Sequence, residues 1–258
     1  MKISKTILIS IALSSFLYSS NIDKSATRVN INILEKTEDI RSLSQNIANE
    51  YLFFYKRNKK DSSEYIEMIK KLNQLNEDII IIAKNTNNKD TKNIVDFLAY
   101  TKNEIELLLK EELKEQNIAL ILDYSEIILE GADSISNNHK YSFSNEENMI
   151  MNIKEMDYLL ERILKFYLAL NLGLNNSNNQ EQLRLSITEF DKNINNIKNY
   201  EYKDTYSLEK KKFLLSWKNN RDLFLKYNEY SIPALLNLSV KNLKQSLDIL
   251  ETYHNKKQ

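Results

Sequence analysis

The chain has 258 residues, of which 42% are apolar and 28% are charged, and its formal net charge is zero. A chain of this length and composition can bury one large core or two ordinary ones. The absence of cysteine excludes disulfides, thiol catalysis and zinc–thiolate sites. Because the sequence has no basic excess, nucleic acid is not an expected partner.

The first twenty residues predict a signal peptide. Lys2 and Lys5 precede the apolar run TILISIALSSFLYSS, which is too short and too rich in serine for a comfortable membrane span. We therefore expect export to the periplasm, with cleavage between about Ser19 and Asn21. The bulky residues just before this cut fit a cleavage site poorly, so an uncleaved anchor stays an alternative.

The scarcity of turn residues predicts an all-α protein, because two glycines and one proline are too few for the turns of a many-stranded sheet. Pro233 suits the first turn of a helix, with Ser231 as its predicted N-cap. Gly131 and the segment SNNHKYSF are predicted to mark the midpoint. Heptad-like apolar spacing predicts helices over residues 23–58, 62–85, 90–135 with a join near 115–117, 145–174, 178–200, 207–228 and 231–254.

The two halves of this pattern resemble each other. Any two amphipathic helices can be aligned to some degree, but the shared helix order favours an internal duplication. We therefore predict two tandem four-helix bundles, at residues 21–139 and 140–258, after a signal peptide at residues 1–20. A shift of 116 positions pairs Ile33 with Met149, Leu34 with Ile150, Ile40 with Met156, Leu43 with Leu159, Ile47 with Ile163, Tyr51 with Tyr167, and Leu52 with Leu168.

Arg41, Ser44 and Gln45 form a polar cluster on the inner side of the first predicted helix. At about 100° per residue, Ser44 lies within the apolar face, while Arg41 and Gln45 lie beside it, near the small Ala48. A buried guanidinium needs a partner, so Arg41 must reach water, a carboxylate or an anionic ligand. One alternative is structural, because Glu38 is one turn away and in position for an ion pair. The other is functional: the cluster holds a small anion through charge-assisted hydrogen bonds.

The segment RSLSQNIANEYL, residues 41–52, resembles the signature of the type IV pilus methyl-accepting chemotaxis transducer N-terminal domain, the PilJ-like domain. The matching residues are Arg41, Leu43, Ser44, Gln45, Ala48, Tyr51 and Leu52. The segments FYLALNLG, residues 166–173, and EQLRLSITEFDKNI, residues 181–194, resemble a second copy. The resemblance covers most of the mature chain, although half of the motif is ordinary helix packing.

That family is similar to the periplasmic sensor domains of nitrate and nitrite histidine kinases. In those four-helix bundles the motif arginine binds the anion across a dimer interface. The resemblance therefore implies a small-anion site at Arg41, with Ser44 and Gln45 as secondary contacts, and it implies a homodimer.

Two departures from the family pattern concern this site. Glu38 stands where the family has glycine, and its carboxylate can neutralise Arg41. In the second copy Asp157 and Leu160 replace the arginine and the serine, so only the first copy can retain the site. A solvent-open pocket around Arg41 would indicate binding, whereas a closed pair with Glu38 or another carboxylate would indicate a scaffold.

An enzyme finds little support in the sequence. The two histidines, His139 and His254, are expected at a linker and at a frayed end. Glu251 and His254 have the Glu-x-x-His spacing of di-iron bundles, but such a site needs a second copy and inward carboxylates from other helices. We therefore predict a non-enzymatic protein with no catalytic residue, no metal and no cofactor.

These features together predict an exported helical-bundle sensor or binding protein for a small anion such as nitrate or nitrite. Signalling relatives continue into a membrane helix and a cytoplasmic output. This chain is therefore expected to act through a membrane partner, either a chemoreceptor or a sensor kinase. The alternative function is a periplasmic structural or adaptor bundle that binds no ligand.

Overall fold

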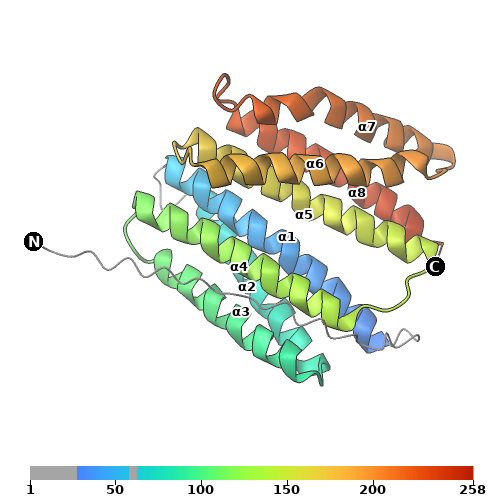
Figure 1. Ribbon diagram of the computed structural model, residues 1–258, viewed down its shortest axis with the longest axis horizontal. Coiled ribbons are helices and arrows are strands. Elements are labelled where there is room, and N and C mark those ends of the chain that lie inside the picture. Colours follow the sequence, from blue (N-terminus) through green and yellow to red (C-terminus); the bar gives the residue numbers. More distant parts are fainter. Residues whose placement is uncertain (1–27, 58–62, 258) are drawn as a thin grey trace, which may run out of the picture.

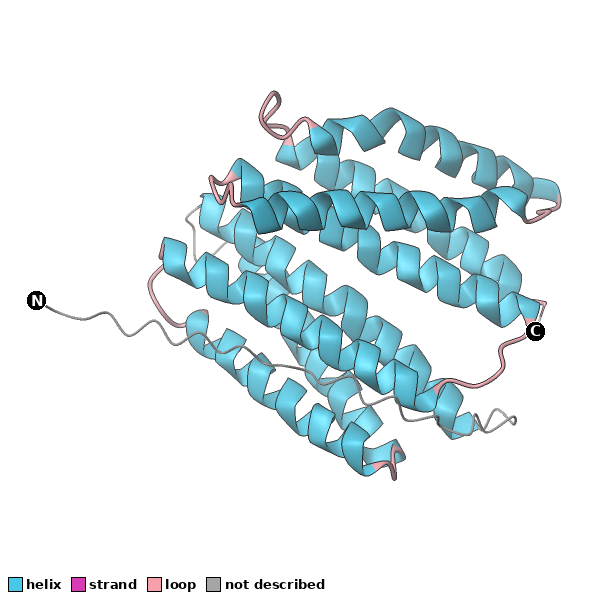
Figure 2. Ribbon diagram, in the orientation of Figure 1, coloured by secondary structure: helices cyan, strands magenta, loops and turns pink. Residues whose placement is uncertain are grey.

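The apolar spacing of the sequence produces helices throughout the part of the chain that the structure describes. The computed structural model describes residues 28–57 and 63–257, and the predicted signal peptide lies outside them. These residues form eight helices and no strand, which confirms the predicted all-α class (Figure 2). The helices are α1 (Arg28–Arg57), α2 (Ser63–Asn85), α3 (Lys89–Leu108), α4 (Glu115–His139), α5 (Asn145–Asn171), α6 (Ser177–Asn199), α7 (Asp204–Leu225) and α8 (Pro233–Asn255).

Local sequence sets several of the helix ends. α5 begins with a capping box, in which the Ser144 side chain accepts from the Glu147 N–H and the Glu147 carboxylate accepts from the Ser144 N–H. Pro233 occupies the first turn of α8, as predicted. Ser231 is not the cap of this helix, because Ile232 holds the N-cap position and the Ser231 hydroxyl donates to a side chain of α5 instead.

Gly131 lies inside α4 and does not mark the midpoint. A Cβ atom at this position would come within 2.6 Å of the Leu98 Cδ2 atom on α3, so the glycine allows these two helices to approach closely. The connection between the two halves is the short segment 140–144, between the end of α4 and the start of α5, and most of it lies in the predicted midpoint segment SNNHKYSF.

The helices run up and down beside one another (Figure 1). α1 packs against α2 and α4, and α3 packs against the same two helices. α5 packs against α6 and α8, and α7 packs against both of these and also touches α5. α1 packs along α5, and this contact joins the first four helices to the last four. The polar residues of α1 therefore lie near the centre of the molecule.

α1 and α5 run parallel. The Ser42 hydroxyl donates to Asp157 at 2.5 Å, and the Lys56 ammonium donates to Asn171 at 3.2 Å. Both contacts join residues that are 115 positions apart, so the offset is unchanged over about four helical turns. Each residue of α1 therefore lies beside the residue of α5 that is about 115 positions later in the chain.

The buried apolar residues of both halves form one connected cluster. Tyr51 and Tyr167, which the predicted repeat pairs, are both fully buried. The Tyr51 ring packs edge-on against Phe54, and the Tyr167 ring packs edge-on against Phe224. α5 is buried on nearly all sides over residues 158–170, as expected for a helix that other helices surround. None of the described helices is long and apolar enough to cross a membrane.

Candidate functional site

Arg41 lies where α1 meets α4 and α5, and its side chain is only 14% exposed. Its Nη1 donates to the Glu38 carboxylate at 2.9 Å, which confirms the ion pair expected one turn away. Its Nε lies 2.9 Å from an Asp133 oxygen on α4. Its guanidinium carbon lies 4.2 Å from the ring centre of Tyr158 on α5, within cation–π range. Arg41 therefore ties three helices together.

The charge state of Arg41 and its carboxyl partners follows from their surroundings. Burial opposes the charge of Arg41, but Glu38, Tyr158 and Asp133 outweigh it and raise the pKa of Arg41. Burial raises the pKa of Glu38 and of Asp133 as well, and Arg41 only partly offsets that effect. Arg41 is therefore always charged, and a small anion would compete with two carboxyl groups already in place.

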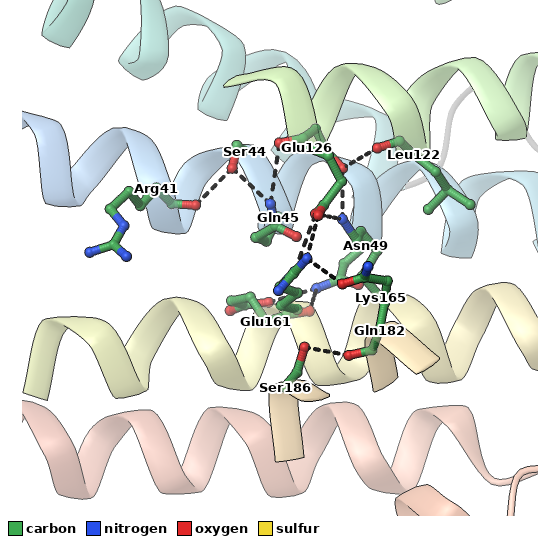
Figure 3. A network of polar contacts seen from close by, with 12 residues as sticks. Arg41, Ser44, Gln45, Asn49, Leu122, Glu126, Glu161, Lys165, Gln182 and Ser186 are labelled. Atoms are coloured by element: carbon green, nitrogen blue, oxygen red, sulfur yellow. Dashed lines mark hydrogen bonds and ion pairs between the residues drawn. The ribbon is translucent and has the colours of Figure 1, made fainter. Parts of the chain in front are cut away.

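Ser44 and Gln45 point into the protein. Ser44 Oγ donates to the Arg41 carbonyl at 2.8 Å, and Gln45 Nε2 donates to Ser44 Oγ at 3.1 Å and to the Ser125 carbonyl on α4 at 3.2 Å (Figure 3). The sequence places Gln45 just outside the apolar face, whereas the residue is fully buried because α4 packs on α1. Ser44 bonds to the Arg41 backbone and not to its guanidinium, so the three predicted side chains do not converge on one point.

A buried lysine that sequence reasoning missed lies beside this cluster (Figure 3). Lys165 on α5 is fully buried, and its Nζ donates to Ser125 Oγ at 2.9 Å and to Glu126 at 2.5 Å. Burial lowers the pKa of Lys165 to about 8, although Glu126 opposes the shift. Burial opposes the charge of Glu126 too, but Lys165 and Arg162 outweigh it and lower the pKa of Glu126 to about 2. The predicted shift of 116 positions pairs Lys165 with Asn49, which is also buried, but no spacing within α5 indicates an inward lysine.

Glu161 is the main buried acceptor between α1 and α5. Its carboxylate accepts hydrogen bonds from Asn46 at 2.9 Å, from Asn49 at 2.8 Å and from Lys244 on α8 at 2.7 Å. Burial opposes the charge of Glu161, but Lys244 and the other donors outweigh it and lower the pKa of Glu161. These contacts hold both halves of the chain against each other.

His254 is fully buried at the end of α8 and is not part of a frayed end. Its Nδ1 lies 2.5 Å from a Glu146 oxygen, and its Nε2 lies 2.8 Å from the Tyr202 hydroxyl. Burial lowers the pKa of His254 despite Glu146, while hydrogen bonds from His254 and Tyr200 lower the pKa of Glu146 against the effect of its burial. The imidazole is therefore neutral, with Nδ1 donating to the carboxylate and Nε2 accepting from Tyr202.

His139 occupies the equivalent place at the end of α4. Its Nδ1 lies 3.4 Å from the side-chain oxygen Oδ1 of Asn30 on α1, and its Nε2 lies 3.0 Å from the Thr91 hydroxyl. Asn30 and Glu146, the Nδ1 partners of the two histidines, are 116 positions apart, which is the shift that the predicted repeat places between α1 and α5. Each histidine thus fixes the end of one half, and the described residues contain no group of three histidine, aspartate or glutamate side chains that could hold a metal ion.

A cavity of about 290 Å³ lies beside Glu38, between α1, α5, α8 and the connection at residues 140–144. Arg41 is not one of the residues in its wall. The arginine therefore does not line this cavity, whereas its carboxylate partner Glu38 does.

No protein-family model, curated protein or solved structure matches the chain. What the chain does is therefore inferred from its own side chains, and the contacts of Arg41 are the most informative of these.

Proposed function

We propose that the protein is an exported, non-enzymatic adaptor bundle in which Arg41 is a structural tie and not an anion receptor. The observation that carries this proposal is the closure of Arg41 by Glu38, Asp133 and Tyr158. Such contacts favour one arrangement of α1, α4 and α5 over others. The adaptor would work in the periplasm and pass its effect to a membrane chemoreceptor or sensor kinase.

We further propose that α1–α4 and α5–α8 are two four-helix units that arose by duplication. Arg41 contacts Tyr158, and Ser42 contacts Asp157. The shift of 116 positions converts each of these pairs into the other. Two copies related by a two-fold axis make reciprocal contacts of this kind, and the two histidine ends support the same relation.

The contact between α1 and α5 would then replace a homodimer interface. The PilJ-like resemblance implies that a motif arginine binds across a dimer. In this chain the helix that carries Arg41 already faces its counterpart from the second unit. A second copy of the chain is not needed to complete the surroundings of Arg41, so we propose that the adaptor acts as a monomer.

The small-anion sensor is the second candidate function. The observation in its favour is that Arg41 lies between the two units, at the place where the resemblance expects nitrate or nitrite. An anion there would have to displace Glu38 or Asp133 from the guanidinium. Ser44 and Gln45 would have to leave their present partners as well.

Unfolding measurements test the structural role of Arg41. Arg41→Ala leaves Glu38 buried without its cation, so we expect the free energy of unfolding to fall by about 3 kcal/mol. The matched control is Arg184→Ala, because that arginine is exposed and lies 3.8 Å from Glu181. The control should change the free energy of unfolding by less than about 0.5 kcal/mol. Equal effects of the two variants would contradict the structural role.

Calorimetric titration of nitrate and nitrite separates the two candidates. An adaptor should bind neither anion in the wild type or in Arg41→Ala. Binding to the wild type that Arg41→Ala weakens by about tenfold or more would overturn the adaptor and establish the sensor. Glu38→Gly removes the competing carboxylate, so binding by this variant alone would mean that Glu38 closes an inherited site and that the wild type is the adaptor.

A further inference from the structure

The cavity beside Glu38, which we call the α1/α5 cavity, is lined by apolar side chains and by acidic side chains. At about 290 Å³ it is at the small end of the range of ligand pockets. The apolar part of the wall consists of Ile31, Leu34, Tyr141, Phe143, Ile150 and Met151. The acidic part consists of Glu35, Glu38, Asp39, Glu147 and Glu251.

The charges in this wall favour a cationic ligand. Five carboxyl groups face two ammonium groups, those of Lys36 and Lys154. Lys36 pairs with Asp39 at 3.0 Å, and Lys154 pairs with Glu251 at 3.3 Å. Of the other three carboxyl groups, Glu38 pairs with Arg41 from outside the wall, and Glu35 and Glu147 have no lysine or arginine partner among the described residues. A cavity with such an excess raises the local concentration of cations and repels anions.

Glu38 adds an independent observation. The residue is 3% exposed, and one of its carboxylate oxygens is held by Arg41. The other oxygen, Oε1, has no hydrogen-bond partner among the described residues. A buried oxygen without a donor is unfavourable, and burial raises the pKa of this group. A ligand N–H beside Glu38 would supply the missing donor.

Two aromatic side chains complete the cavity. The rings of Tyr141 and Phe143 pack edge to face, with their centres 4.6 Å apart. The Tyr141 hydroxyl donates to Glu147 at 2.6 Å, which fixes the ring in place. Aromatic faces attract organic cations, and the aliphatic residues nearby suit a hydrocarbon body. A bare metal ion does not fit, because the described residues include no set of three ligands for one.

We propose that the α1/α5 cavity binds a small organic ammonium ion that carries an apolar or aromatic body. Its ammonium group donates to Glu38, and its body packs on Tyr141 and Phe143. This binding is independent of the adaptor role, because Arg41 ties the helices whether or not the cavity is filled. The ligand would touch both halves of the chain, through α1 on one side and α5 on the other.

Calorimetry with three probes of one shape tests the charge requirement. The probes are phenethylammonium, 2-phenylethanol and phenylacetate, which share a body and differ in charge. We expect phenethylammonium to bind and the two others to bind at least about tenfold more weakly, because only the cation gains a charge-assisted hydrogen bond. Absence of phenethylammonium binding at millimolar concentration, or equal binding of the alcohol, would overturn the proposal.

Variants locate the site. Glu38→Gln should weaken phenethylammonium binding by at least about tenfold. Glu35→Gln and Phe143→Ala change the rim and an aromatic wall, and each should weaken binding by about twofold to fivefold. These two keep the proposal testable if Glu38→Gln does not fold, as judged by circular dichroism. The control Glu181→Gln changes an exposed carboxylate outside the cavity and should have no effect. Unchanged binding in the folded cavity variants would overturn the proposal.

Discussion

The two halves of the molecule share a helical frame, but they carry opposite charges at two paired positions of their first helices. Glu38 and Arg41 stand one turn apart on α1, and the equivalent positions on α5 are Lys154 and Asp157. Two identical parallel helices would bring like charges to the same height of their contact. The reversal of sign avoids this repulsion, so it favours packing of the two halves on each other.

The buried polar residues differ between the halves in the same way. Gln45 on α1 is neutral and bonds within its own half, to Ser44 and Ser125. Its counterpart on α5, Glu161, is charged and bonds to both halves. The two halves therefore have similar apolar cores but different buried polar residues, and those of α5 make the hydrogen bonds between the halves.

The largest expected effect comes from removing the buried carboxylate that α5 has where α1 has a neutral glutamine. Glu161→Ala removes the acceptor of Asn46, Asn49 and Lys244, so we expect the free energy of unfolding to fall by about 3 to 5 kcal/mol. Gln45→Ala removes two neutral hydrogen bonds, each contributing about 0.5 to 1.5 kcal/mol, and should cost about 1 to 3 kcal/mol. Urea unfolding followed by circular dichroism measures both values. Similar losses in the two variants would mean that the buried charge has no special role.

A smaller difference is expected between the paired tyrosines. The Tyr167 hydroxyl donates to the Tyr230 carbonyl at 2.8 Å and accepts from the Ile232 N–H at 3.0 Å. The Tyr51 hydroxyl has no hydrogen-bond partner among the described residues, although Asn117 is near enough to influence its pKa, which burial raises to about 12. Tyr167→Phe should therefore lower the free energy of unfolding by about 1 to 3 kcal/mol.

The matched change Tyr51→Phe removes a buried hydroxyl whose contact with Asn117 falls outside the geometry of a hydrogen bond. It should leave stability within about 0.5 kcal/mol of the wild type or raise it slightly. Thermal unfolding of the two variants side by side provides the comparison. A larger loss of stability in Tyr51→Phe than in Tyr167→Phe would contradict the prediction that only the Tyr167 hydroxyl stabilises the fold.

Much of the fold could be predicted from the sequence, because it depends on local spacing. The apolar period gave all eight helices to within a few residues at most ends, and the paired positions Tyr51 and Tyr167 are both buried. The Arg41–Glu38 pair was predictable for the same reason, since both residues lie on one helix. Ser231 failed as a cap because its hydroxyl found a partner on another helix.

The rest of the candidate site depends on how separate helices face one another. Asp133 and Tyr158 reach Arg41 from α4 and α5, and no spacing within α1 specifies them. Lys165 resembles a surface lysine until α1 and α4 cover its side of α5. His254 lies near the chain end, but the aromatic ring of Tyr202 and the carboxylate of Glu146 enclose it. Partners that are remote in sequence decide each of these cases.

The smallest effect should come from the two histidines, which differ in the charge of their Nδ1 partners. Burial lowers the pKa of both His139 and His254 from the ordinary value of about 6.5. As pH falls below about 6.5, the unfolded chain binds a proton that the folded chain does not, until the pH reaches the folded pKa. Stability therefore falls with pH in this window, by at most about 1.4 kcal/mol per pH unit for each histidine.

The carboxylate of Glu146 compensates a proton on His254, whereas the neutral amide of Asn30 cannot do so for His139. We therefore expect His139→Gln to reduce the pH dependence of stability between pH 5 and 6.5 more than His254→Gln does. Glu146→Gln should make the dependence steeper than in the wild type, because it leaves His254 with a neutral neighbour. Urea unfolding at several pH values gives these slopes, and the difference between each variant and the wild type removes the contribution of the carboxyl groups whose pKa burial raises. A slope that Glu146→Gln leaves unchanged would mean that the two histidine ends respond to acid alike, whatever the charge beside them.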